Sequence, residues 1–266
     1  RSGRRRAYDI FFKTVVYLSA FLTVALLVVL IGYIFVRGLP HITGQLLSTA
    51  PSVLMDTIGI LPNILNTLYI ILFTLLIALP LGVGAAVYLT EYASNRRLIE
   101  VIEFTNETLA GIPSIIYGLV GMIILVPAIR TAFGLADGAC LLAAIVVLAI
   151  MILPSIISVS ETALNAVPKE YEEASLALGA TEIETYFRVS VPAAKSGITA
   201  SIVLGIGRAI GEAMAVMMVA GNVANMPSLF QSVRFLTTAV ASEMSYSSGL
   251  QRQALFSIAL VLFLFI

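Results

Sequence analysis

The sequence predicts an all-α membrane protein with about six transmembrane helices. Of its 266 residues, 59% are hydrophobic and only 11% are charged, whereas ordinary soluble domains carry about 25% charged residues. A spanning helix needs about 20 mostly apolar residues. Six segments meet or approach that length, at about 14–36, 63–89, 107–129, 139–160, 197–221 and 253–266. Lipid is therefore the expected solvent for most of the chain.

The first and last apolar segments set the expected organisation. Segment 14–36 is longer than a signal-peptide core, and no small-residue cleavage site follows it, so we expect a retained membrane helix. Segment 253–266 spans about 21 Å against a bilayer core of about 30 Å, so we expect this helix to continue beyond the given sequence. Residues 1–62 form an N-terminal basic segment, a first helix and an outer loop, and residues 63–266 form the core.

Lysine and arginine residues predict the orientation, because short cytoplasmic loops are enriched in them. With the N-terminus inside, the inner segments hold Arg1, Arg4, Arg5, Arg6, Lys13, Arg96, Arg97, Lys169, Arg188 and Lys195. The outer segments then hold Arg37, Arg130, Arg234 and Arg252. We therefore expect a cytoplasmic N-terminus anchored by its basic start. The outer segments, at about 37–62 and 222–252, are expected to pack as short helices, and the longest inner segment covers about 161–196.

The longest inner segment carries signals for two short helices joined at a glycine. Pro168 suits a first helical turn, where its missing N–H costs nothing. Gly179 suits the left-handed position that ends a helix. Thr181 and Glu184 form a capping box for a second helix, which Pro192 limits at its far end. These signals fit an amphipathic loop on the membrane surface, and equally a helix that docks into a groove of another protein.

The same segment resembles the EAA loop of binding-protein-dependent ABC importer permeases, whose pattern is E-A-A-x3-G-x9-I-x-L-P. The matching residues are Glu173, Ala174, Ser175, Gly179, Val189, Val191 and Pro192, with the same spacing throughout. Ser175, Val189 and Val191 depart mildly from the pattern. The resemblance implies a coupling helix that docks into a cleft of an ATPase subunit. It assigns this coupling to Glu172, Glu173, Ala174, Leu178, Gly179 and Pro192.

Two further stretches, "LAGIPSIIYGLVG" and "GRAIGEAMAVMMVAGN", resemble permeases of phosphate-specific (Pst) importers. The second stretch and "LTTAVASEM" are more similar to the PstC type of permease than to the PstA type. The resemblance covers nearly the whole chain from about residue 60. It implies the type I ABC importer permease architecture, with phosphate as the transported anion.

Arg208 and Glu212 place two charges inside segment 197–221. A charge at the bilayer centre costs roughly 2.5–3.5 kcal/mol on an insertion scale, so such residues face a water-filled cavity or the bundle interior. On a continuous helix, their four-residue spacing puts them on one face, where they can pair. The guanidinium fork suits phosphate. We therefore expect Arg208 to receive an anion in transit, with Glu212 holding it in place.

A competing interpretation of this segment is structural. Gly207 and Gly211 stand four residues apart, and Gly205 and Ser201 lie about one and two turns before Arg208. Such small residues let helix backbones approach closely. Arg208 and Glu212 would then be a buried ion pair that fixes the register of a tight helix contact. The Pst resemblance favours the substrate pathway, because an arginine and a glutamate at this motif are implicated in phosphate passage in that family.

The "GIPSIIYG" stretch is the second candidate for the pathway. Pro113 removes a backbone hydrogen bond inside the expected helix, and Ser114 and Tyr117 offer hydroxyl groups. A proline-kinked helix that serves only packing explains the same residues equally well.

The composition argues against an enzyme. No G-x-x-x-x-G-K-[ST] loop is present, so we expect ATP and Mg²⁺ to bind a separate ATPase chain and no cofactor to bind this one. The single histidine, His41, and the single cysteine, Cys140, do not make a metal site. No aspartate or histidine lies in an expected span, which argues against a paired-aspartate protease and a Ser–His hydrolase.

The expected function is that of a permease subunit in an ATP-driven phosphate importer of the prokaryotic inner membrane. Its expected partners are a homologous PstA-like permease, an ATPase dimer, a soluble phosphate-binding protein and membrane lipid, with no nucleic acid. The alternatives are a permease for another oxyanion, such as molybdate or sulfate, and an ATPase-independent channel or membrane scaffold.

Overall fold

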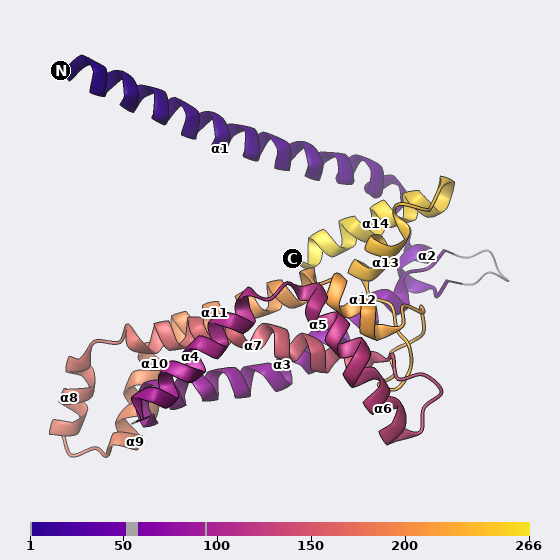
Figure 1. Ribbon diagram of the computed structural model, residues 1–266. Helices are drawn as coiled ribbons and strands as arrows, with labels where there is room; N and C mark the ends of the chain where they lie inside the picture. Colours follow the sequence, from indigo (N-terminus) through magenta and orange to yellow (C-terminus); the bar gives the residue numbers. More distant parts are fainter. Residues whose placement is uncertain (1, 52–57, 94) are drawn as a thin grey trace.

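The computed structural model describes residues 2–51, 58–93 and 95–266, and these residues fold into helices joined by short irregular segments (Figure 1). The helices are α1 (Ser2–Gly38), α2 (Gly44–Ser48), α3 (Leu61–Val87), α4 (Arg96–Gly111), α5 (Ser114–Val120), α6 (Val126–Phe133), α7 (Leu141–Asn165), α8 (Lys169–Ala177), α9 (Glu182–Thr185), α10 (Val191–Ala193), α11 (Lys195–Gly211), α12 (Met214–Ala220), α13 (Leu236–Glu243) and α14 (Gly249–Phe265). Three π-helical segments, η2 (Tyr88–Tyr92), η3 (Gly121–Leu125) and η4 (Tyr186–Ser190), extend α3, α5 and α9, and a 3₁₀ turn, η1 (Leu39–His41), follows α1.

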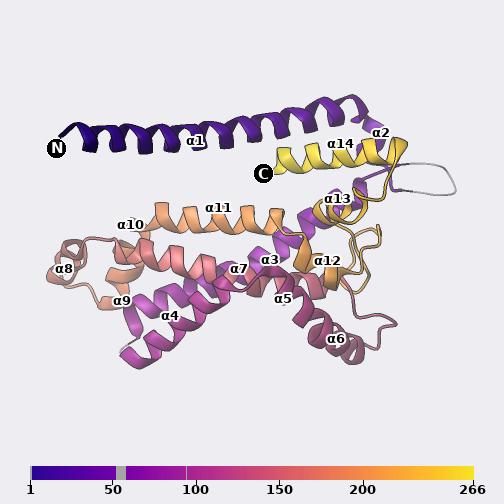
Figure 2. The same ribbon diagram turned by 45° about the horizontal axis from the view of Figure 1, so that its top comes forward.

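Four helical segments among the described residues are long and apolar enough to cross a membrane, namely Tyr8–His41, Leu61–Tyr92, Ser114–Phe133 and Leu141–Asn165. A fifth candidate is the pair Glu182–Ala193 and Lys195–Gly211, which is bent by 64°, and Gly249–Phe265 is shorter. The expected all-α membrane architecture is confirmed. Helix α8 and helix α9 lie at one end of the layer formed by α3, α7 and α11, and α2 and α13 lie at the other (Figures 1 and 2).

Helix α7 is the centre of the core. Most of its apolar side chains are buried between α3 and α11. Small residues allow the close packing: a side chain at Gly82 of α3 would collide with Ile156, and Ser160 hydrogen-bonds Ser201 of α11 at 2.9 Å. The buried hydroxyl pair satisfies two polar groups that would otherwise be unpaired in an apolar interior.

Helix α1 contacts the rest of the chain mainly through α14. The Tyr33 ring meets the Phe256 ring edge-on at 5.6 Å between centroids, and the Ser257 hydroxyl donates to the Gly38 carbonyl at 2.8 Å. Figure 1 shows the N-terminal half of α1 projecting away from the core. Its apolar side chains from Tyr8 onward are exposed, as expected for a helix whose solvent is lipid.

The outer segments partly follow the expectation of short helices. Helix α2 and η1 lie in the first segment and α13 lies in the second, while residues 52–57 of the first segment lie outside the described residues.

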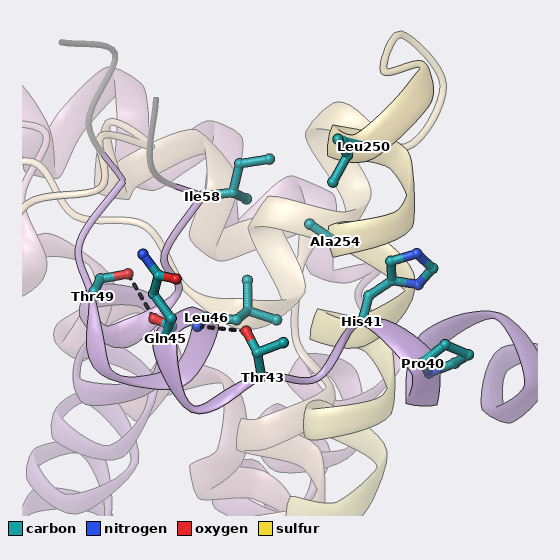
Figure 3. A pocket seen from close by; sticks show the side chains of 9 residues that line it. All are labelled: Pro40, His41, Thr43, Gln45, Leu46, Thr49, Ile58, Leu250 and Ala254. Carbon is teal, nitrogen blue, oxygen red and sulfur yellow. Dashed lines mark hydrogen bonds between the residues drawn. The ribbon is translucent and has the colours of Figure 1, made fainter. Parts of the chain in front are cut away.

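A cavity of about 390 Å³ lies between the α2 region and α14 (Figure 3). Its lining includes Thr43, Gln45 and Thr49 on one side and Leu250 and Ala254 on the other. His41 lies at the edge of this cavity, as expected for a residue of the outer rim. Arg1 and the side chains of Arg4, Arg5 and Arg6 also lie outside the described part, so their expected anchoring role stays a prediction.

Two expected spans are not continuous helices. In the span expected at 107–129, α4 ends at Gly111, and α5 begins at Ser114 after Ile112 and Pro113. In the span expected at 197–221, α11 ends at Gly211 and α12 begins at Met214. At 107–129 the sequence predicted a helix kinked at Pro113, and the structure has a break there. At 197–221 one continuous helix was expected, and that expectation was wrong. Gly211, a poor helix former, stands at this second break, but no proline does.

Candidate functional site

The break in the fifth expected span separates Arg208 from Glu212. Glu212 has extended backbone angles, φ −75° and ψ 129°, so it leaves the helix that carries Arg208. The ion pairs in the described part of the chain are Lys13–Asp9, Arg96–Glu100 and Arg234–Glu243, and Arg208–Glu212 is not among them. The predicted Arg208–Glu212 pair is therefore wrong, because four-residue spacing brings side chains together only on an intact helix.

Arg208 is instead held by a neighbouring helix. Its Nη1 donates to the Ser155 hydroxyl at 2.7 Å, and the guanidinium is half-buried. Ser155 directly follows Pro154, which lies inside α7. A neutral hydroxyl orients a guanidinium without cancelling its charge, so Arg208 keeps a positive charge that is available to an anion.

Glu212 stabilises the break itself. Its Oε1 accepts from the Ala215 backbone N–H at 3.0 Å, at the start of α12. Its own backbone carbonyl accepts from the Thr237 hydroxyl at 2.8 Å. A carboxylate near a helix N-terminus is favourable because the first N–H groups lack partners inside the helix. Glu212 therefore caps α12 and does not form the predicted pair with Arg208.

The break at Pro113 lies against the break at Glu212. Helix α5 packs on α12, and a Cβ at Gly118 would come within 2.7 Å of the Ala215 Cα. Only glycine permits this approach, which brings the middle of α5 against the start of α12. The Tyr117 hydroxyl donates to the Leu109 carbonyl at 2.7 Å and so satisfies an acceptor at the end of α4.

The predicted pathway residues come from both breaks. Ser114 is the first residue of α5 and is half-buried. The Tyr117 phenol lies within electrostatic reach of the Arg208 guanidinium, and it also lines an apolar cavity of about 400 Å³ against α7. The structure therefore brings Arg208, Glu212 and Tyr117 into one region through the contact between α5 and α12. Their contact with a substrate stays a prediction.

Of the small residues of α11 that were predicted to pack closely, Gly205 and Ser201 do pack on α7, whereas Gly207 and Gly211 do not. Gly207 and Gly211 are exposed, and a Cβ built on either would meet no described atom within 4 Å. The residues that pack on α7 are Gly197, against Ala163, and Gly205, whose Cβ would lie 3.3 Å from Ile156, together with Ser201. Gly207 and Gly211 instead leave the face beside Arg208 open.

The inner loop has the predicted helix, glycine corner and second helix. Helix α8 begins directly after Pro168, and Gly179 has the left-handed φ of +88°. The Thr181–Glu184 capping box is present, and its hydrogen bonds from Thr181 lower the pKa of the Glu184 carboxyl. Helical structure runs on to Ala193, one residue past Pro192, before the 64° bend into α11.

The loop presents apolar side chains to the surface. Leu178 is 90% exposed at the tip. The other exposed large apolar side chains of the loop are Tyr171, Leu176, Ile183 and Phe187. Beneath this surface, hydrogen bonds join the two halves of the loop: the Ser190 hydroxyl donates to Glu172 at 2.7 Å, and Ser175 hydrogen-bonds Thr185 at 2.8 Å. An exposed apolar surface of this kind suits docking to another protein.

Sequence reasoning missed two residues of the site. Ser155 was not singled out as a candidate for the site, although a hydroxyl in an apolar span is a signal for a polar partner. Thr237 lies in the stretch LTTAVASEM, which carried the family resemblance but gave Thr237 itself no expected role. Its partner is a backbone carbonyl of a distant residue, and no local pattern could have indicated it.

Comparison with known proteins identifies the family. The family described as "Binding-protein-dependent transport system inner membrane component" matches residues 78–266. This chain belongs to that family. It is therefore an inner-membrane permease subunit, and its family implies partnership with an ATPase and with another permease.

Individual relatives agree with the family. The chain is 41% identical over 215 residues to the probable ABC transporter permease protein YqgH of Bacillus subtilis, covering 78% of this chain and 69% of the relative. It is 37% identical over 238 residues to the phosphate transport system permease protein PstC of Haemophilus influenzae, covering 82% and 75%. An inward-facing structure of the MetNI methionine ABC transporter matches the fold with a TM-score of 0.55 at 23% identity, over 78% of this chain and 89% of that one.

Proposed function

We propose that this chain is the transmembrane permease subunit of an ATP-driven inorganic phosphate importer and forms half of its translocation pathway. The proposal rests on the environment of Arg208. This arginine is half-buried, is oriented by the neutral Ser155 hydroxyl, and lies beside two adjoining helix breaks. The similarity to permeases named PstC supports phosphate as the anion.

The substrate step follows from the charge of Arg208. A guanidinium offers a planar set of donors that matches phosphate oxygens. Broken helices also expose unpaired backbone groups to a substrate at the membrane midplane. Glu212, anchored at the start of α12, keeps a negative charge nearby without neutralising Arg208. Binding that is strong enough to admit the anion, yet weak enough to release it, is what a transport site requires.

The coupling step is proposed for the loop from α8 to α10. Leu178 and its apolar neighbours would dock on an ATPase subunit, which binds ATP and Mg²⁺, while this chain binds no cofactor. Glu172, Glu173, Ala174, Gly179 and Pro192 shape this loop. ATP binding would close an ATPase dimer, move the loop and, through the bend before α11, rock the helix that carries Arg208.

The remaining proposed partners follow from the same assembly. A homologous PstA-like permease would complete the pathway on the open face beside Gly207 and Gly211. A soluble phosphate-binding protein would deliver phosphate to the rim built by residues 37–62 and 222–252, at the end of the molecule opposite α8.

Uptake of labelled phosphate by vesicles carrying the co-purified assembly tests this function. ATP-dependent uptake that excess sulfate and molybdate leave unchanged is the expected result. Uptake that sulfate or molybdate suppresses would assign the chain to another oxyanion. Purification without any ATPase, from cells that produce one, would instead favour a channel or scaffold.

A further inference from the structure

The local sequence does not fully explain the break at Glu212. Residues 204–216 contain no proline. Gly211, directly before Glu212, is a poor helix former, but Gly205 and Gly207 are equally poor and lie within the intact helix α11. The backbone nevertheless leaves the helix at Glu212 and Ala213, where φ and ψ are −75° and 129° and then −124° and −49°. A break in an apolar segment exposes backbone polar groups, and these need partners from elsewhere in the fold.

Thr237 supplies one of those partners from a distant segment. Its hydroxyl donates to the Glu212 carbonyl at 2.8 Å across 25 positions of sequence, and the residue is only 9% exposed. The carbonyl that it satisfies belongs to the residue whose carboxylate caps α12. Thr237 therefore bonds the backbone of Glu212, and this bond fixes the direction in which the Glu212 side chain points.

The outer segment that carries Thr237 is itself attached to α3. The Leu236 N–H donates to the Thr67 hydroxyl at 3.1 Å, and the Asn66 side-chain amide donates to the Arg234 carbonyl at 3.2 Å. Arg234 in turn pairs with Glu243. Thr237 is thus held by α3 on one side while it holds Glu212 on the other.

We propose that Thr237 is a positioning residue of the substrate pathway, which holds Glu212 in extended backbone and thereby keeps the helix broken beside Arg208. The proposal deepens the proposed function and rests on it for the transported anion. It also links the outer rim, where the substrate enters, to the pathway residues by one hydrogen bond. Movement of the outer segment then changes the position of Glu212 directly.

The test uses three variants in the complete assembly. Thr237→Val keeps the shape and removes the donor, and Thr237→Ser restores a hydroxyl. Thr199→Val is the matched control, because the Thr199 hydroxyl donates to the Lys195 carbonyl within its own helix. We expect Thr237→Val to lower maximal phosphate uptake about fivefold, which corresponds to about 1 kcal/mol for one hydrogen bond. Thr237→Ser and Thr199→Val should retain uptake within about twofold.

A second readout does not depend on phosphate. Met214→Cys places a thiol at the first residue of α12, where the side chain is 54% exposed, and the natural Cys140 is buried. We expect Thr237→Val, but not Thr199→Val, to change the labelling rate of this thiol at least threefold, with Thr237→Ser restoring the parent rate. A variant that only misfolds would instead lower the yield of assembled complex, which is measured in parallel.

Each combination of results decides one claim. Unchanged labelling in Thr237→Val overturns the positioning role. Changed labelling with unchanged uptake overturns the link from Thr237 to transport. If the parent assembly takes up no phosphate while Thr237→Val still changes the labelling rate of the thiol, that result overturns phosphate transport and supports the role of Thr237 in positioning the break.

Discussion

The inner loop and the broken fifth span differ in the interactions that accompany their conformations. In the loop, Gly179 adopts its left-handed φ of +88°, and the Thr181–Glu184 capping box forms, each as local sequence signals indicate. In the fifth span, α11 ends at Gly211 and Glu212 leaves the helix, although Gly205 and Gly207 of the same span stay helical. Local hydrogen bonds and backbone preferences determine the first region. In the second region, Ser155 and Thr237, both distant in sequence, bond the Arg208 guanidinium and the Glu212 carbonyl.

The difference matters because the two regions have different proposed tasks. A docking loop must keep its shape when its partner leaves, so intrinsic signals suit it. A transport pathway must rearrange, and single hydrogen bonds between separate elements are easier to exchange than a continuous helix.

Arg208→Ala should lower phosphate uptake about a hundredfold or more, since charge-assisted contacts with an anion contribute about 1.5–3 kcal/mol each. The assembly should still form, because the docking loop is untouched. Uptake by reconstituted vesicles measures the effect, and Arg130→Ala, at an exposed arginine of α6, is the control. Arg208→Lys should remain far below the parent if the guanidinium fork matters. Parent-like uptake in Arg208→Ala would remove Arg208 from the pathway.

Gly179→Val should lower ATP-driven uptake about tenfold, because a β-branched residue at φ +88° costs about 1–2 kcal/mol or more and opens the corner. The ATPase should be retained poorly in pull-down of the complex. Gly134→Val imposes a similar strain at φ +63° outside the loop, so it should keep the ATPase. Gly179→Asn should be milder, because asparagine tolerates this conformation. Equal ATPase retention in Gly179→Val and Gly134→Val would contradict a docking role for the loop.

Ser155→Ala should lower phosphate uptake about threefold to tenfold, because the Arg208 guanidinium loses the hydroxyl that orients it. Ser160→Ala is the matched control on the same helix, since the Ser160 hydroxyl bonds Ser201 instead. The apparent KM for phosphate should rise in Ser155→Ala only. A KM that moves equally in both variants would indicate general loosening of α7.

The Thr181–Glu184 capping box should give the smallest effect, seen as a pH dependence of the loop. Hydrogen bonds from Thr181 lower the pKa of Glu184 below the unfolded value of 4.5, so the stabilisation is present above that pH and is lost as pH falls through the lower folded value. Hydrogen exchange at the start of α9, corrected for intrinsic rates, should therefore accelerate below about pH 4.5. Glu184→Gln should remove this dependence, and Glu182→Gln, on the same short helix, should keep it.

Much of the fold was predictable because apolar composition and length dictate membrane helices. The spans around α1, α3 and α7 appear where hydropathy places them. The break at Pro113 was partly predictable, because proline lacks the N–H that a helix interior needs. The break at Glu212 was not, because a glycine such as Gly211 does not by itself break a helix. The Thr237 hydroxyl, which bonds the Glu212 carbonyl, lies 25 residues away in α13.

The sequence by itself determined that the chain resides in lipid, that its inner loop is a helix–glycine–helix unit, and that an arginine and a glutamate enter an apolar span. Only the tertiary structure decided that these two charges do not pair. Ser155 of α7 holds Arg208, and the start of α12 holds Glu212, because packing of α5, α7, α12 and α13 around the break offers each group a partner that a continuous helix cannot.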